Sequence, residues 1–259
     1  MREVLYAVQN HQMNSIQFNL SCASLPSLPR ELAESELIHL HDTLSQSGIK
    51  VAAVSGTFNM IHPIHEQREL GLIGLETIAK AAHLIGTNVI TLCTGSRDGH
   101  NMWSFHPENN SEKAWTELLV MMEKALKIAE KYNVILGVEP ELSNVVNTAE
   151  KAKKLLDLFP SERLKIIMDG ANLIPLHQTV ETHSILNEAF DLLGDHIVLA
   201  HAKDFSIEQG AFVAAGQGDF DYDHYISLLK SVHYNGSLIL HSLNEEQVPE
   251  SYSFLEKLL

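Results

Sequence analysis

Short apolar runs alternate with longer amphipathic segments along the whole chain. The short runs, rich in β-branched residues, predict strands at 15–22, 49–56, 88–95, 134–141, 164–171, 196–204 and 236–242. Segments with helical periodicity predict helices at 31–47, 66–85, 112–132, 147–158, 181–193, 222–233 and 246–258. Strands that alternate with helices pair in parallel, because each helix returns the chain to the same edge of the sheet.

The strand runs indicate a barrel. Runs such as "LKIIM" (164–168) and "VILGV" (134–138) carry apolar residues on both alternations of the strand, so both of their faces are covered. A dinucleotide-binding sheet usually shows a G-x-G-x-x-G turn after its first strand, and the chain has none there. We therefore predict an α/β fold of the (β/α)8 TIM-barrel type, with residues 1–259 as one domain.

The N-terminus departs from a complete barrel. The opening residues "REVLYAVQNHQM" (2–13) read as a helix, so seven strands are counted and the first strand of a closed eightfold barrel is missing. An irregular segment could close the gap, a neighbouring subunit could cover it, or two strand edges could stay exposed. We expect a homo-oligomer that covers this gap.

Four consecutive strand runs end in a residue able to bind a metal ion. These residues are Glu139, Asp169, His201 and His241. Since the active site of a parallel barrel lies at the carboxyl ends of its strands, the four side chains are expected to converge. A mixed oxygen and nitrogen donor set suits Mn, Zn, Co or Fe better than Ca. The alternative is structural, because strands often end in polar residues where the chain leaves the core.

Two further ionisable residues share the side of these candidates. Side chains two apart on a strand point the same way, so Glu141 accompanies Glu139 and Lys203 accompanies His201. We predict a catalytic role for Glu139, Glu141 and Lys203: a carboxylate as general base and an ammonium that stabilises charge on a carbonyl oxygen. Alternatively, Glu141 caps the loop that follows it and Lys203 pairs with a surface carboxylate.

Loops after other strands supply candidate substrate contacts. These are His62, Arg97 and Trp103. The guanidinium of Arg97 offers a fixed fork for a carboxylate or phosphate, and the indole of Trp103 offers a flat face to a sugar. A role in loop packing is the alternative for each residue.

Charge and composition narrow the class of partner. The chain has 18 Lys+Arg against 33 Asp+Glu, a formal charge of −15, without a basic cluster, so nucleic acid and anionic membranes are not expected partners. No apolar window reaches the roughly 18 residues of a membrane span, and the start lacks the layout of a secretory signal. The two cysteines, Cys22 and Cys93, suggest a reduced compartment, and we expect a cytoplasmic protein.

Several motifs together resemble those of a known family. The motifs are "SGTFNMIHP" (55–63), "TLCTGSRD" (91–98), "MWSFHPENN" (102–110), "GVEPELSNVV" (137–146), "MDGANL" (168–173), "HAKD" (201–204), "GQGDFDY" (216–222) and "LILHSLNEEQVPES" (238–251). With these motifs, the chain from about Val51 to Leu255 resembles the sugar phosphate isomerase/epimerase family of the xylose-isomerase-like TIM barrel superfamily.

The resemblance implies one divalent metal ion, such as Mn, Zn, Co or Mg, bound by Glu, Asp, His and Glu. Glu139, Asp169 and His201 match the first three ligands, whereas His241 stands where a second Glu is expected. Because a metal-bound imidazole cannot act as a base, one base remains for an isomerisation or an elimination.

The predicted function is therefore that of a metal-dependent isomerase or epimerase that moves a proton next to the carbonyl of a sugar or sugar derivative. A lyase or dehydratase and a non-catalytic metal-binding barrel stay as alternatives. The negative charge argues against a nuclease on the same fold.

Overall fold

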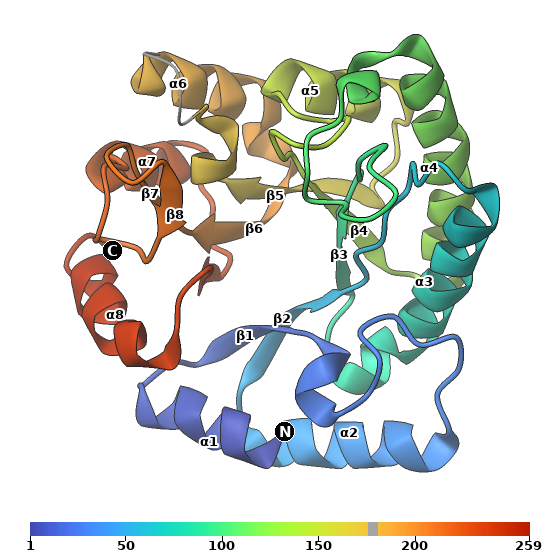
Figure 1. The fold of residues 1–259 in the computed structure, drawn as a ribbon. Helices are drawn as coiled ribbons and strands as arrows, with labels where there is room; N and C mark the ends of the chain where they lie inside the picture. The colour runs from blue at the N-terminus through green and yellow to red at the C-terminus, as the bar shows by residue number, and fades with distance from the viewer. Residues whose placement is uncertain (176–180) are drawn as a thin grey trace. The chain divides into compact units, whose positions relative to one another are not determined.

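The computed structural model describes residues 1–175 and 181–259, which form an α/β fold with parallel strands (Figure 1). The parallel strands are β1 (Ser15–Phe18), β2 (Lys50–Ser55), β3 (Val89–Cys93), β4 (Ile135–Glu139), β5 (Leu164–Asp169), β6 (Ile197–Ala202) and β9 (Leu238–Leu240), in this order in the sheet. The helices are α1 (Arg2–Asn10), α2 (Glu34–Ser47), α3 (His65–Ile85), α4 (Glu112–Tyr132), α5 (Ala149–Leu158), α6 (Thr182–Leu193), α7 (Tyr222–Ser231) and α8 (Val248–Glu256). The predicted TIM-barrel type with seven strands is confirmed.

The N-terminal segment also agrees with the prediction. Residues 2–10 form α1, and no strand precedes β1 in the part of the chain that the structure describes. The first predicted strand ends early, at Phe18, because the Asn19 side chain accepts a hydrogen bond from the backbone N–H of Ser21 (2.9 Å). That bond caps the 3-10 turn η1 (Leu20–Ala23) and stops the strand.

A small hairpin was not predicted. The run 196–204 was expected to be one strand, but β6 ends at Ala202, and Asp204 begins β7 (Asp204–Ser206), which pairs antiparallel with β8 (Ala211–Val213). Strands of three residues are too short to show an alternation of apolar and polar positions.

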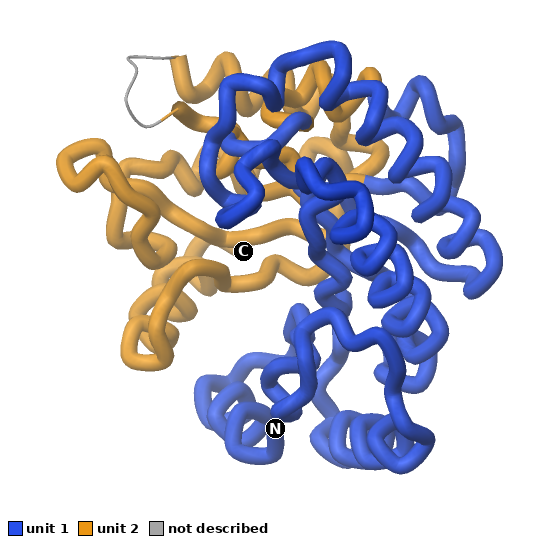
Figure 2. The backbone as a smooth tube through the Cα atoms, turned by 45° about the vertical axis from the view of Figure 1, so that its right-hand side comes forward, with its two compact units in different colours: residues 1–139, 143–145, 155–165 blue, residues 140–142, 146–154, 166–259 orange. Residues whose placement is uncertain are grey.

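The described residues group into two compact units (Figure 2). Unit 1 comprises residues 1–139, 143–145 and 155–165, and unit 2 comprises residues 140–142, 146–154 and 166–259. That the whole chain is one domain stays a prediction.

Unit 1 contains the first four strands. The register of β3 against β4 runs from Val89 opposite Ile135 to Cys93 opposite Glu139, and every residue of β3 is buried. Helices α3 and α4 are joined by ion pairs, one between Lys124 and Glu69 (2.5 Å) and one between Lys131 and Glu76 (2.6 Å).

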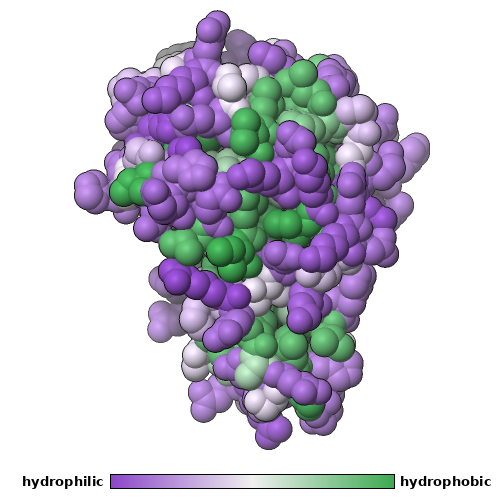
Figure 3. All heavy atoms as spheres, turned by 90° about the vertical axis from the view of Figure 1, so that its right-hand side faces the viewer, coloured by the Kyte–Doolittle hydropathy of each residue, from purple (hydrophilic) through white to green (hydrophobic). Residues whose placement is uncertain are grey.

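The surface of unit 1 carries scattered apolar side chains. Ile73 and Leu84 on α3 and Val120 on α4 are exposed, and Figure 3 shows apolar patches between polar residues on the side where these helices lie in Figure 1. Exposed apolar side chains of this kind are ordinary for a folded protein, because more than half of the surface of a typical protein is apolar. None of the described helices is both long enough and apolar enough to cross a membrane.

Unit 2 contains the ends of β5, β6 and β9, where three candidate ligands lie. The register of β5 against β6 begins with Ile166 opposite Ile197 but continues with Ile167 opposite Leu199, so Val198 is an extra residue in β6. As a result Asp169 faces His201. The next pair of strands, β6 and β9, ends with Ala202 opposite Leu240, which is followed directly by His241.

A buried tyrosine joins two of these strand ends. The hydroxyl of Tyr225 on α7 lies within hydrogen-bonding distance of the carbonyl oxygens of Met168 (2.9 Å) and His201 (3.2 Å). Tyr225 is fully buried and packs edge-on against Phe190 and Phe220. The side chain thus holds the residue before Asp169 and His201 itself at fixed positions.

Candidate metal centre

Three of the four predicted metal ligands lie together at the strand ends of unit 2. Asp169, His201 and His241 each offer one ligand atom, and these atoms lie within 4.8 Å of one another. In a tetrahedral site with bonds of about 2.1 Å, ligand atoms are roughly 3.4 Å apart. Side-chain rotations that bring the atoms about 1 Å closer would therefore let the three groups share one ion.

The carboxylate of Asp169 is buried but only partly hydrogen-bonded. Its Oδ1 accepts a hydrogen bond from the backbone N–H of Asn172 (3.3 Å), whereas its Oδ2 has no hydrogen bond among the described residues. The nearest positive or potentially positive groups to Oδ2 are Lys203 Nζ at 3.3 Å and His201 Nδ1 at 3.6 Å. A buried oxygen in this state is a suitable ligand for a cation.

Charge around Asp169 keeps its carboxyl group ionised. Burial by itself would raise the pKa of Asp169, but Lys203, followed by His201 and His241, outweighs it and lowers the pKa to about 2. The carboxylate is therefore negative throughout the neutral pH range, as a metal ligand has to be.

The two imidazoles lie parallel. The ring centroids of His201 and His241 are 4.9 Å apart, with an angle of 2° between the ring planes. His201 is buried and His241 is partly exposed. The backbone N–H of His241 donates to the carbonyl of Ala202 (3.0 Å), and its Nδ1 lies 2.9 Å from Ser242 Oγ.

This set of residues fits a divalent transition metal. One carboxylate oxygen and two imidazole nitrogens match the ligands that Zn, Mn, Co and Fe take in proteins. The buried Asp169 Oδ2, which lacks a hydrogen bond within the described residues, supports the same conclusion. The three residues thus fit one divalent ion, and the predicted site of these residues with Glu139 stays a prediction.

A chain of polar contacts connects the centre to the predicted catalytic residues Lys203 and Glu141. The ammonium group of Lys203 donates to Asn172 Oδ1, and Asn172 Nδ2 donates to Glu141 Oε1 (2.7 Å). Lys203 is buried, at 3% exposure, and its carboxylate partner is the buried Asp169 rather than a surface group. The alternative of a surface ion pair for Lys203 is therefore wrong.

Asn172 was missed by the sequence analysis, although it belongs to the motif "MDGANL". It lies on the 3-10 turn η3 (Gly170–Leu173), and Asp169 caps that turn. A capping aspartate fixes the residue three positions later, which is the signal that points to Asn172.

Glu139, the fourth predicted ligand, ends β4 in unit 1. It is buried, at 7% exposure, and pairs in register with Cys93. Its roles as a metal ligand and as a catalytic residue stay predictions.

The predicted substrate-binding Arg97 is buried in unit 1. Its Nη2 lies 2.5 Å from Glu117 Oε2, and its Nη1 donates to the carbonyl of Ile61 (3.3 Å). Arg68 binds the same Glu117 oxygen (3.0 Å). The guanidinium of Arg97 thus has partners within unit 1, as in the loop-packing alternative, and substrate binding by Arg97 stays a prediction.

His62 and Trp103, the other two predicted substrate contacts, lie in loops of unit 1. The ring of His62 lies 3.1 Å from the carbonyl of Gly99 and accepts a hydrogen bond from the N–H of Ile64 (3.1 Å). The side chain of Trp103 is 51% exposed. Substrate binding by either residue stays a prediction.

Asp204 organises the loop after the hairpin. Its Oδ1 accepts from the backbone N–H groups of Phe205 (2.8 Å) and Phe220 (2.9 Å), and its Oδ2 from those of Gly216 (3.0 Å) and Gly218 (3.1 Å). Burial raises the pKa of Asp204, and the four donors offset this only in part. The "GQGDF" segment is therefore held by one buried side chain.

Comparison with a family model agrees with this fold. The model described as "Xylose isomerase-like TIM barrel" matches residues 5–258, nearly the whole chain. The resemblance predicted from about Val51 onward is thereby confirmed and extends to α1.

Individual proteins are similar over most of their length. The Haemophilus influenzae protein named "Putative L-ribulose-5-phosphate 3-epimerase SgbU" is 25% identical over 223 residues, which are 82% of this chain and 73% of that protein. The structure of the 3-keto-D-glucoside 4-epimerase YcjR from E. coli has a TM-score of 0.73 at 17% identity, covering 99% of this chain and 94% of the other.

A solved structure of a xylose isomerase-like TIM barrel protein from Mycobacterium smegmatis contains magnesium. It has a TM-score of 0.72 at 15% identity and covers 99% of this chain and 87% of its own. At these identities the two solved structures establish a shared fold.

Proposed function

Because the chain belongs to the xylose isomerase-like TIM barrel family, we propose that it is a metal-dependent isomerase or epimerase of a sugar or sugar derivative. The observation that carries the proposal is the convergence of Asp169, His201 and His241 at the strand ends of unit 2. The names of the similar proteins, a putative L-ribulose-5-phosphate 3-epimerase and a 3-keto-D-glucoside 4-epimerase, support the reaction class.

The proposed cofactor is one divalent ion, Mn, Zn, Co or Mg, held by Asp169, His201 and His241. When bound, such an ion acts as a Lewis acid that polarises a substrate carbonyl. The magnesium in the related structure supports a divalent ion. Glu139 is the proposed fourth ligand, on the sequence motif alone.

Glu141 is the proposed base that takes a proton from the carbon next to the carbonyl. One oxygen of its carboxylate is held by Asn172 (2.7 Å), which fixes the orientation of the group. The same Asn172 accepts a hydrogen bond from Lys203, so base and ammonium are positioned by one amide.

Lys203 is the proposed stabiliser of the negative charge that develops on the carbonyl oxygen. Its ammonium group is buried beside Asp169, so little water screens its charge. The ring of Phe212 covers the ammonium at 4.0 Å from the ring centroid, which limits access of water further.

The proposal is tested by metal analysis of the purified protein and by incorporation of solvent deuterium into a panel of sugars. We expect about one divalent ion per chain and deuterium next to the carbonyl, without loss of water. In Asp169→Asn, which replaces one carboxylate oxygen by NH2 and removes the negative charge, we expect metal content to fall below a tenth and activity to fall at least about 100-fold.

Asp191→Asn is the matched control, because Asp191 is an exposed aspartate of α6, and it should leave metal and exchange unchanged. Elimination of water would identify a lyase instead. Bound metal without either reaction would favour the non-catalytic barrel, and absence of metal would contradict the proposal.

We propose the cytoplasm as the place of this activity, since a chain with two cysteines, Cys22 and Cys93, lacks the cysteine content of a disulfide framework. A homo-oligomer is the proposed assembly, as the count of seven strands suggests.

A further inference from the structure

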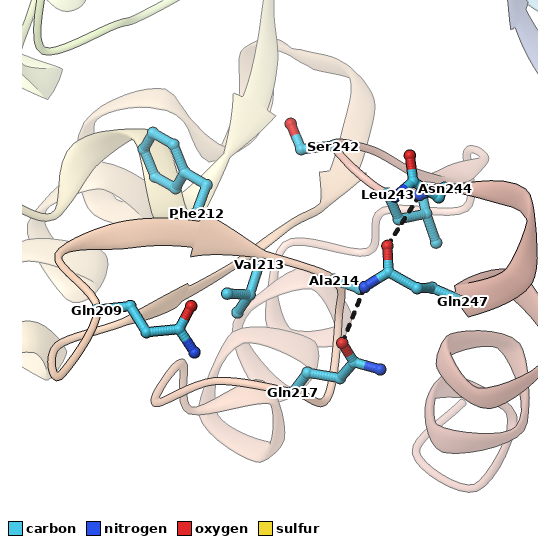
Figure 4. Close-up of a pocket in the computed structure, with 9 residues that line it drawn as sticks. All are labelled: Gln209, Phe212, Val213, Ala214, Gln217, Ser242, Leu243, Asn244 and Gln247. Carbon is cyan, nitrogen blue, oxygen red and sulfur yellow. Dashed lines mark hydrogen bonds between the residues drawn. The ribbon is translucent and has the colours of Figure 1, made fainter.

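Unit 2 contains a cavity of about 600 Å³ (Figure 4). It lies between the β7–β8 hairpin and the segment after β9. Its lining residues are Gln209, Phe212, Val213, Ala214, Gln217, Ser242, Leu243, Asn244 and Gln247. The volume is that of a typical small-molecule site.

Two lining residues connect the cavity to the metal centre. Ser242 Oγ lies 2.9 Å from Nδ1 of His241. The ring of Phe212 lies over Nζ of Lys203, and this Nζ is 3.3 Å from Asp169. A molecule in the cavity therefore lies next to the groups to which the proposed function assigns the chemistry.

The polar lining consists of uncharged groups. Gln247 Nε2 donates to Gln217 Oε1 (3.0 Å), and Gln247 Oε1 accepts from the N–H of Asn244 (2.9 Å), as the dashed lines in Figure 4 show. Side-chain amides carry both donors and acceptors, so they suit hydroxyl groups, which also donate and accept. The lining includes neither a lysine nor an arginine.

The charges beside the cavity are unfavourable for an anion. Gln217 Nε2 donates to the carboxylate of Glu250 (3.0 Å), and Glu208 and Glu245 flank lining segments along the chain. The nearby cation Lys203 is bonded to Asp169 and Asn172, and its third N–H is the donor that the proposed function assigns to the carbonyl oxygen rather than to a phosphate. Protein sites for phosphate normally supply arginine or lysine.

We infer that this cavity binds the neutral, hydroxyl-rich end of the substrate, so the substrate is an unphosphorylated sugar or a glycoside. Phe212 is 41% exposed, and the face of its ring that does not cover Lys203 is suited to stack on the C–H face of a sugar ring. The inference rests on the proposed function, because it assigns the substrate class of that same site.

The test compares binding of sugars with binding of their phosphates to the metal-loaded protein. Calorimetry with matched pairs, such as L-ribulose and its 5-phosphate or D-fructose and its 6-phosphate, gives dissociation constants without any turnover. We expect at least one neutral sugar to bind about 10-fold or more tightly than its phosphate, because the acidic neighbours repel the anion.

Gln209→Lys adds a positive charge to the cavity and is expected to reduce this preference by about 10-fold. The control Gln46→Lys makes the same change at an exposed position of α2 outside the lining and should leave the preference unchanged. Equal or tighter binding of the phosphates, binding of no neutral sugar, or an equal response to both variants would overturn the inference.

The outcome of this binding test is independent of the outcome of the proton-exchange test of the proposed function. Tight binding of a neutral sugar without proton exchange would retain this assignment and reject the isomerase. Exchange with a preference for phosphates would retain the isomerase and reject this assignment.

Discussion

Asp169 and Asp204 are two buried aspartates of unit 2, each at 1% exposure, and they are used in opposite ways. Both oxygens of Asp204 accept hydrogen bonds from backbone N–H groups, four in total. Asp169 accepts one such bond, and its second oxygen faces the side chains of Lys203 and His201 instead. Backbone donors make Asp204 part of the fold, whereas Asp169 keeps an oxygen for a ligand.

The two carboxyl groups also differ in the charge of their neighbours, and their pKa values shift in opposite directions. Burial dominates at Asp204 and raises its pKa, because its partners are neutral amides. At Asp169, Lys203 and the two histidines outweigh burial and lower the pKa to about 2. Burial alone therefore says little about a carboxylate; the kind of donor next to it decides what the group does.

The largest expected effect that separates the two is on stability. Asp204→Asn replaces an acceptor by an amide whose NH2 group faces backbone donors, so buried N–H groups lose their partner. We expect the free energy of unfolding to fall by about 3 kcal/mol, as measured by urea denaturation.

Metal affinity measured on the folded Asp204→Asn protein should stay within about threefold of the wild type, in contrast to Asp169→Asn. A loss of metal comparable to that of Asp169→Asn would remove the distinction between the two aspartates.

A somewhat smaller effect on stability is expected when the pH of the metal-free protein is lowered. The pKa of Asp169 is lowered on folding, from 3.8 to about 2, so its stabilising contribution is present above pH 3.8 and is lost as pH falls through about 2. Relative to Asp169→Asn, the wild type should lose about 2 kcal/mol of stability between pH 5 and the acid limit.

The contribution of Asp204 to stability should change with pH in the opposite direction. A carboxyl whose pKa is raised on folding contributes stability below its unfolded pKa, and this contribution is lost as pH rises through the folded value. Urea titrations of wild type and both variants from pH 2 to pH 6 measure the two slopes. Slopes of equal sign would show that the two carboxyl groups are not distinguished by their neighbours.

The smallest effect is expected at Tyr225, which supports the Asp169 side only. Tyr225→Phe removes the donor to the carbonyl groups of Met168 and His201 and should cost about 1 kcal/mol of stability. Because these carbonyls hold the ligand-bearing strands, metal affinity should also fall by several-fold in equilibrium dialysis.

Phe190→Leu is a suitable comparison for Tyr225→Phe, since Phe190 packs on Tyr225 without touching those carbonyls through a hydrogen bond. It should lower stability and leave metal affinity unchanged. Equal losses of affinity in both variants would mean that the hydroxyl has no specific part in positioning the site.

Much of the fold was predictable because its elements are regular. Strands alternate with helices along the chain, and the strand ends of a parallel sheet lie on one rim, so Asp169, His201 and His241 could be named together before any coordinates. Asn133 and Gly86 end their helices in the left-handed conformation, which explains why the predicted ends of these helices agree with the observed ends.

Other features depend on contacts that periodicity does not encode. The bond between Lys203 and Asn172 joins β6 to the turn after β5, and a pattern of apolar positions carries no record of such a pair. The β7–β8 hairpin has strands of only three residues, and the segment after it is held by the Asp204 side chain, which accepts hydrogen bonds from backbone N–H groups. The part that Glu139 plays rests on its motif alone.

The extra residue Val198 in β6 carries a consequence for the chemistry of the rim. If β5 and β6 kept the register with which they begin, Ile166 opposite Ile197, the methyl group of Ala200 would lie opposite Asp169. Successive side chains of a strand point to opposite faces, so the imidazole of His201 would then be turned away from its carboxylate neighbour. The ability of this rim to hold a cation thus depends on the count of residues in one strand as much as on which residues stand there.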